Sequence, residues 1–155
     1  MRASVTSSLH FTDCRIPAAH ALPLAKGLKS ALACLNQARY GIGWGAVGAA
    51  EDCFDTARAY TLERKQFDNQ PIASHQLVQK SLADLISALS QAKLLALHCG
   101  RLKDQGKLLP HQISLLKRNN VAMALDTARQ CRDLLGANGV TDDYPFMRHM
   151  ANLES

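Results

Sequence analysis

The chain has 155 residues, of which 47% are hydrophobic and 5% aromatic, and it carries a formal net charge of +5. This length suits one domain, or one domain with a fragment of another, and it is enough to bury a core without disulfides or metals. No apolar run approaches membrane-spanning length, and no long apolar stretch near the N-terminus marks a secretory signal.

The cysteines, histidines and basic residues give no pattern typical of a metal or nucleic-acid site. The five cysteines include no C-x-x-C pair, and the six histidines form no H-x-x-x-H pattern. We interpret the cysteines as small residues in a reducing compartment, three of them on apolar helical faces. Lysines and arginines form no stripe with interleaved aromatics, so nucleic-acid binding ranks low, although the positive charge suits a phosphate-bearing ligand. The cysteines are Cys14, Cys34, Cys53, Cys99 and Cys131.

The N-terminal residues 1–30 differ from the rest of the chain. Short apolar runs separated by serine and aspartate predict one or two short strands. Pro17 and Pro23 follow, and neither suits a strand interior. Because two short strands have too little to pair with on their own, this segment is expected to pack against something absent from the sequence. The apolar positions are Val5, Leu9, Phe11 and Ile16.

A helical pattern begins at about residue 31 and continues to about Lys65. Apolar residues recur there at steps of three and four. Four glycines interrupt the pattern, but no strand precedes them and no G-K-[ST] follows, so we interpret them as sites of close helix packing rather than a phosphate loop. The predicted buried face is Leu35, Ala38, Ile42, Ala46, Ala49 and Cys53, and the glycines are Gly41, Gly43, Gly45 and Gly48.

Two more long helices are predicted. Residues 66–71 are rich in turn formers, and the next helix is expected to be capped by Ser74 or opened by Pro71, and to end near Lys103. Pro110 opens a third helix, for which Gly136 is a natural C-cap. The predicted buried positions are Val78, Leu82, Leu85, Leu89, Ala92, Ala96 and Cys99, followed by Val121, Ala124, Ala128, Cys131 and Leu135.

A short fourth helix is expected to begin around residues 141–143, ahead of Pro145. The predicted fold class is therefore all-α. We expect an up-and-down bundle of three long helices plus a truncated fourth, with a short extended remnant at the N-terminus.

Two segments hold the candidate chemistry. Arg64 lies at the predicted end of the first helix, where it either stabilises the helix dipole or grips a diphosphate with its forked guanidinium. Phe67 either packs on a ring system or is buried in the core. The small residues of 133–139 either cap a helix or let another molecule approach the backbone closely. Neither segment decides between these alternatives alone.

Together, the order and separation of these motifs resemble the C-terminal domain of the acyl-CoA dehydrogenase family. In that family an E-R-x-x-F motif ends the first long helix, a glutamine follows at the start of the next, and L-G-G-N-G ends the third. Several further stretches resemble the glutaryl-CoA dehydrogenase branch. The family motifs match residues 63–67, His75, Gln76, residues 135–139, Tyr144, Pro145 and Arg148. The stretches that resemble the glutaryl branch are residues 35–45, 100–105, 114–120 and 152–154. Arg2, Ala3 and Ser4 resemble the end of that branch's middle β-domain.

The resemblance implies an FAD-dependent enzyme that oxidises the α–β bond of an acyl-CoA, with glutaryl-CoA as substrate and decarboxylation in that branch. A glutamate removes the α-proton, a hydride passes to the flavin, and electrons leave through an electron-transferring flavoprotein. The protein positions and polarises the cofactor and substrate. The resemblance also implies homo-oligomers, dimers or tetramers, in the bacterial cytoplasm or the mitochondrial matrix, with no membrane insertion.

The resemblance assigns site residues position by position. Arg64 and Phe67 would contact FAD, with Arg64 on the pyrophosphate. Gln76 and residues 133–137 would line the FAD site of a neighbouring subunit. A second stretch would border the CoA substrate channel. Residues 1–30 would be the remnant of the middle β-domain with its linker, and residues 31–155 the truncated helical domain. The cofactor residues are Arg64, Gln66, Phe67, Gln76, Asp133, Leu134, Leu135, Gly136 and Ala137, and the substrate residues are Leu32, Ala33, Cys34, Leu35, Asn36, Gln37, Ala38 and Arg39.

The sequence departs from the family pattern at three places. Ala137 replaces the second glycine of L-G-G-N-G, and Asp68 and Asn69 stand where a glycine commonly follows E-R-x-x-F. In the glutaryl branch the catalytic glutamate lies in a Y-E-G-T motif shortly after N-L-E, and this sequence contains no such motif. We therefore expect no catalytic residue in this chain, and no activity from it alone. The alternative is a helical association module without ligand, which has no need of Arg64.

Overall fold

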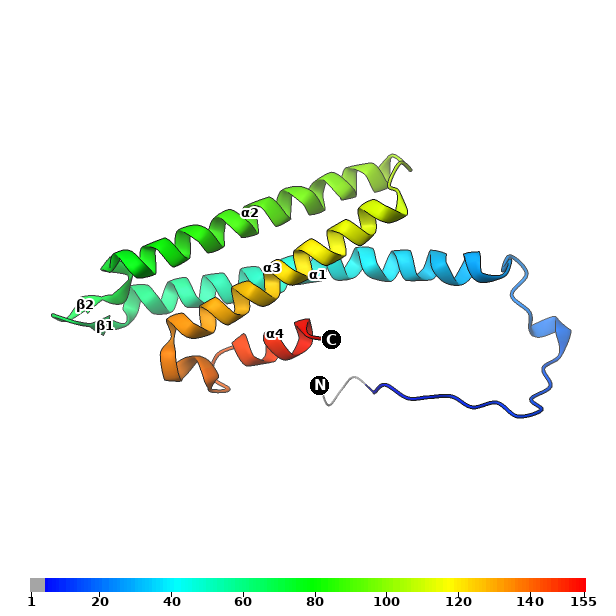
Figure 1. Cartoon of the computed structure of the whole chain (residues 1–155), viewed down its shortest axis with the longest axis horizontal. Coiled ribbons are helices and arrows are strands. Elements are labelled where there is room, and N and C mark those ends of the chain that lie inside the picture. Colours follow the sequence, from blue (N-terminus) through cyan, green and yellow to red (C-terminus); the bar gives the residue numbers. More distant parts are fainter. Residues whose placement is uncertain (1–4) are drawn as a thin grey trace.

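The computed structural model describes residues 5–155, so the resemblance at Arg2, Ala3 and Ser4 lies outside the described residues. Three long helices run alternately up and down, and a short fourth helix lies against the bundle (Figure 1). The predicted all-α bundle is confirmed. Within residues 5–155 the elements are η1 (Ala18–His20), α1 (Leu28–Glu63), β1 (Lys65–Gln66), β2 (Gln70–Pro71), η2 (Ile72–Ser74), α2 (Gln76–Asp104), α3 (Pro110–Leu134), η3 (Gly136–Val140) and α4 (Phe146–Leu153).

The segment before α1 forms no strand between residues 5 and 27, so the predicted strands are wrong. This segment is extended apart from the short η1 turn, all its residues are exposed, and it runs out from the bundle (Figure 1). The physical reason is the absence of a partner: a strand needs neighbouring backbone to satisfy its hydrogen bonds, and no part of residues 28–155 provides it. Val5 and Phe11 are 85% and 76% exposed.

The buried face of α1 begins only at Gly43. Ala46 and Cys53 are buried as predicted, but Leu35 and Ile42 are each 48% exposed, so that part of the predicted face is wrong. The first turns of α1 extend beyond the ends of α2 and α3, which therefore cannot cover them (Figure 1). Ile42 lies farther along α1, where it lines open cavities with Asn152 and Leu153. A Cβ at Gly43 would lie 2.7 Å from Cγ of Leu116, which confirms close packing at this glycine.

The buried stripes of α2 and α3 largely match the prediction. Leu85, Leu89, Ala92, Ala96 and Cys99 are buried in α2, and Ala124, Ala128 and Cys131 in α3. Val78, Leu82 and Val121 are half-buried. Cys53, Cys99 and Cys131 are thus core residues, whereas Cys14 and Cys34 are exposed.

The start of α2 differs from the prediction, whereas its end at Asp104 lies next to the predicted Lys103, and α3 begins as expected at Pro110. Neither Ser74 nor Pro71 caps α2: the Ser74 hydroxyl donates to the Pro71 carbonyl at 2.8 Å within η2, and the helix begins one residue after His75. At the start of α3, the Leu109 N–H donates to the Gln112 side chain at 2.9 Å. This bond satisfies one donor that the helix end would leave free.

The buried Asn120 connects the three long helices. From α3, its Nδ2 donates to the carbonyl of Gly43 in α1 at 3.1 Å and to that of Ala92 in α2 at 3.3 Å. The residue is 1% exposed, so these bonds compensate the amide nitrogen for the loss of water, whereas Oδ1 is buried with no hydrogen-bond partner among residues 5–155.

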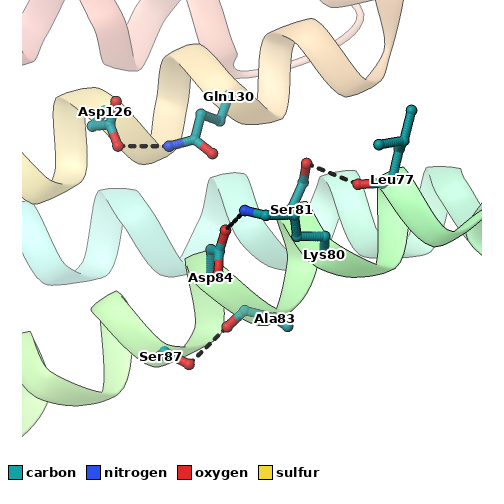
Figure 2. Close-up of polar contacts among 8 residues, drawn as sticks. All are labelled: Leu77, Lys80, Ser81, Ala83, Asp84, Ser87, Asp126 and Gln130. Carbon is teal, nitrogen blue, oxygen red and sulfur yellow. Dashed lines mark hydrogen bonds and ion pairs between the residues drawn. The ribbon is translucent and has the colours of Figure 1, made fainter.

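The exposed polar residues of α2 and α3 bond mainly within their own helix. Ser81 and Ser87 donate to carbonyls one turn earlier, at 3.1 Å and 2.7 Å, and Lys80 pairs with Asp84 at 2.5 Å (Figure 2). In α3, Gln130 donates to Asp126 at 2.6 Å. These pairs are typical of a solvated face with mixed charge, not of a continuous basic surface.

The fourth helix packs against α1 and α3. Phe146 is fully buried, and the Asp52 carboxylate of α1 lies 2.7 Å from His149 Nε2 and 3.9 Å from Arg148. The helix begins at Phe146 with no side-chain cap, so residues 141–143 do not start it as predicted. None of the helices in the described part of the chain is long and apolar enough to cross a membrane.

Candidate functional site

A cavity of about 390 Å³ lies where α1 and α3 both end. The small β1–β2 hairpin and η2 form one side of it, and η3 forms another. It brings together Arg64, Gln66 and the whole predicted stretch 133–137, although the two groups are about seventy residues apart in sequence. The lining is Tyr60, Arg64, Gln66, Ile72, Asp133, Leu134, Leu135, Gly136, Ala137 and Asn138.

Arg64 has a fixed backbone and a free side chain. Its N–H donates to the Tyr60 carbonyl at 2.8 Å, and its own carbonyl accepts from the Ile72 N–H at 2.8 Å. The side chain is exposed at the surface of the bundle. None of the ion pairs found among residues 5–155 includes Arg64. Its guanidinium is therefore available to a ligand or to another chain.

The turn after α3 has a backbone that needs glycine at two positions. Gly136 has a φ of +58°, the left-handed conformation that commonly ends a helix, as the sequence predicted. A Cβ at Gly139 would lie 2.3 Å from the Arg132 carbonyl oxygen, so only glycine lets the turn pack this closely. Ala137 is not among the residues with positive φ, so its methyl group adds no backbone strain.

Three residues of the lining, Tyr60, Ile72 and Asn138, were not among the predicted site residues. Asn138 Nδ2 donates to the Tyr60 hydroxyl at 2.8 Å and so joins the end of α1 to η3. The Tyr60 ring also meets Tyr144 edge-on, with ring centroids 5.7 Å apart. The available signal was the position of Tyr60 one helical turn before Arg64, because residues four apart share a helix face.

The charges around the cavity nearly cancel. The C-terminal ends of α1 and α3 each contribute partial negative charge from unpaired carbonyls. Asp133 adds a carboxylate, although this residue also pairs with Arg132. Arg64 is the only cation in the lining. An anion bound here would therefore depend strongly on that one guanidinium.

Phe67 and Gln76 do not line the cavity. Phe67 is 75% exposed at the tip of the hairpin, where its ring meets His75 edge-on at 5.4 Å. It has a φ of +51°, and Asp68 and Asn69 have φ values of +55° and +59°. Gln76 is exposed at the first turn of α2. Their assignment to the cofactor stays a prediction.

The predicted substrate residues lie at the other end of α1. Residues 32–39 are exposed except for Asn36 and Arg39, which are half-buried. The Gln37 side chain accepts from Lys103 Nζ at 2.7 Å, which fixes one point of the stretch against α2. At 1.5 Å per helical residue, Arg39 and Arg64 are separated by roughly 37 Å. One copy of the chain therefore keeps the two predicted sites far apart.

Comparison with known proteins agrees with this arrangement. The chain matches the family model described as "Acyl-CoA dehydrogenase, C-terminal domain" over residues 25–155. It is 36% identical over 146 residues to an acryloyl-CoA reductase (NADH) of Anaerotignum propionicum, covering 94% of this chain and 37% of that protein. It is 34% identical over 146 residues to a probable short/branched chain specific acyl-CoA dehydrogenase of Dictyostelium discoideum, covering 94% and 35%.

Solved structures show the same similarity. A glutaryl-CoA dehydrogenase from Mycobacterium smegmatis superposes with a TM-score of 0.83 at 53% identity, covering 86% of this chain and 34% of that one. A glutaryl-CoA dehydrogenase from the same organism in complex with FADH2 gives 0.83 at 49% identity, covering 85% and 34%. The chain thus spans little more than a third of the length of these relatives. It belongs to the acyl-CoA dehydrogenase family, whose C-terminal helical domain it matches.

Proposed function

We propose that this chain supplies the part of an FAD site that holds the cofactor's diphosphate, in an enzyme that oxidises an acyl-CoA. The observation that carries the proposal is the free, exposed guanidinium of Arg64 beside the open cavity. A guanidinium presents parallel N–H donors that match the oxygens of a diphosphate. The likeness to glutaryl-CoA dehydrogenases favours glutaryl-CoA as the substrate.

The lining fits a dinucleotide. Hydrogen-bond donors are available at Arg64, Gln66 and Asn138, and apolar surface at Ile72 and Leu135. Bound FAD supplies the hydride acceptor; the residues of this chain bind and orient it. The cavity volume is near the lower end of the range for ligand pockets, roughly 300 to 1,000 Å³, so we infer that it holds only part of the cofactor.

The rest of the site is proposed to come from another chain. The substrate stretch and the cavity lie at opposite ends of α1, which favours a homo-oligomer, a dimer or tetramer, in which each site combines parts of two copies. In this proposal electrons leave through an electron-transferring flavoprotein, and the enzyme works in the bacterial cytoplasm or the mitochondrial matrix. The chain alone is proposed to be inactive, because it contains no residue matching the family's catalytic base.

Binding of FAD to the purified chain tests the proposal. Arg64→Ala removes the only cation of the lining and should weaken binding at least tenfold, since a hydrogen bond to a charged group contributes about 1.5–3 kcal/mol. Isothermal titration calorimetry or NMR titration measures the change. Arg118→Ala, on the exposed surface of α3, is the matched control and should leave affinity unchanged. Equal affinity of Arg64→Ala and wild type would favour the ligand-free association module.

A further inference from the structure

The Tyr60 hydroxyl is held in the cavity by one hydrogen bond. It accepts from Asn138 Nδ2 at 2.8 Å, and Tyr60 lines the same cavity as Arg64. The residue is half-buried, and its ring is already held by the edge-on contact with Tyr144. The hydroxyl is therefore positioned on both sides, by its ring and by the amide that bonds to it.

The proton of this hydroxyl has no acceptor. A phenol carries one O–H donor besides its lone pairs. Among the hydrogen bonds of residues 5–155, Tyr60 Oη takes part only as the acceptor from Asn138. The Asn138 amide hydrogen approaches a lone pair of this oxygen, and a proton on the same oxygen is repelled by it. The proton is therefore directed to the other side, away from Asn138.

Because the cavity carries little net charge, a second hydrogen-bond donor would strengthen the binding of an anion. Arg132 pairs with Asp133, so the two helix C-termini, at about half a negative charge each, are left to oppose the single guanidinium of Arg64, and the site is close to neutral. A hydroxyl adds a donor without adding a negative charge that would repel an oxyanion, and a lone pair of this oxygen already accepts from Asn138. Tyr60 precedes Arg64 by one helical turn, and residues four apart lie on the same helix face.

We infer that Tyr60 is a ligand-binding residue whose hydroxyl donates to an oxygen of the same diphosphate that Arg64 grips, with Asn138 setting the direction of its proton. This inference rests on the proposed function, because it needs the cavity to bind a diphosphate. It adds a direct contact that the motif matches do not assign. A purely structural Tyr60 would only join α1 to η3.

Binding of inorganic pyrophosphate, FAD and adenosine to the full 155-residue chain separates these roles. Tyr60→Phe keeps the ring and removes the hydroxyl. We expect it to weaken pyrophosphate and FAD binding about tenfold, the effect of one hydrogen bond to a charged group, and to leave adenosine binding unchanged. Tyr144→Phe, which removes a hydroxyl outside the cavity lining, should change none of the three affinities.

Two variants make the outcome decisive. Asn138→Ala removes the contact between α1 and η3 but keeps the tyrosine proton, so it should lose much less pyrophosphate affinity than Tyr60→Phe. If the two variants lose affinity equally, Tyr60 acts only through the position of η3 and the inference is overturned. If Arg64→Ala weakens binding while Tyr60→Phe does not, the inference fails and the proposed function stands. If wild type binds neither pyrophosphate nor FAD, both fail.

Discussion

The backbone of Arg64 and the side chain of Tyr60 are positioned before any ligand arrives. The backbone of Arg64 is held on both sides, by Tyr60 and by Ile72, while its guanidinium stays free. Tyr60 is held by Asn138 and Tyr144. Because a donor that is already in place loses little conformational freedom on binding, such positioning favours affinity.

At the scale of residues, the buried cysteines predict a dependence of stability on pH. Burial, with a smaller contribution from Asp52 in the first case, raises the pKa of Cys53 and Cys131 from 9.0 to about 12. Above pH 9 the unfolded chain therefore loses protons that the folded chain keeps. Stability from these thiols is complete below pH 9 and falls as the pH rises toward 12, by at most about 1.4 kcal/mol per pH unit for each thiol.

Urea unfolding between about pH 8 and pH 11 measures this slope. Lysines and tyrosines also titrate in this range, so the comparison is with the double variant Cys53→Ala, Cys131→Ala. That variant should be less stable at pH 8, because two core side chains are truncated, but its stability should fall less steeply. An identical slope in both proteins would contradict the assignment to these thiols.

At the scale of elements, two glycines of α1 have different surroundings, one closely packed and one open. Gly43 faces Leu116, with no room for a Cβ, whereas nothing lies within 4 Å of a Cβ at Gly45. Gly43→Ala should therefore destabilise the chain by about 1–3 kcal/mol through overpacking. Gly45→Ala should stabilise it by up to about 1 kcal/mol, because alanine is the better helix former. Thermal or urea unfolding of the two variants checks both signs.

Gly45 serves as the matched control because it lies on the same helix within one turn of Gly43. Destabilisation of similar size in both variants would show that the surface beside Gly45 is covered. Such a result would need a second chain seated there, and light scattering at the same concentrations would reveal it.

The helix faces that could be predicted are those whose partners lie within the chain. Leu85, Leu89 and Cys99 are buried as expected because α1 and α3 cover them. Leu35 and Ile42 follow the same periodicity and are exposed. Periodicity identifies an apolar face, but the burial of that face depends on what packs against it. The exposed Val5 and Phe11 illustrate the same limit for strands.

The residues that line the cavity could likewise be predicted only in part. Arg64 and Gly136 were predicted from motif order, and the fold places them in one lining. Tyr60 was missed because its role depends on Asn138, which lies 78 positions away in sequence and meets it only after three helices have packed. Phe67 belongs to the same motif as Arg64, but three consecutive left-handed residues turn it out to the surface.

At the scale of the whole molecule, the chain is expected to show no acyl-CoA oxidation by itself. The purified chain with FAD, glutaryl-CoA and an electron-accepting dye should not reduce the dye faster than FAD alone. The reason is that proton abstraction needs a positioned base, and the sequence contains no Y-E-G-T motif. A spectrophotometric assay of dye reduction measures this.

A complete glutaryl-CoA dehydrogenase in the same assay shows that substrate and dye are competent. Turnover by the chain that depends on glutaryl-CoA would contradict the expectation and would require another carboxylate to act as the base.

The buried amide of Asn120 affects the cavity at the end of the bundle. Its Nδ2 meets carbonyls of both α1 and α2, at Gly43 and Ala92, and only one sliding position of α3 along its neighbours allows this. A shift by a single residue would strand the amide in an apolar core. Since Arg64 follows α1 and Gly136 follows α3, the alignment of the two cavity walls is set in the middle of the bundle, far from either wall.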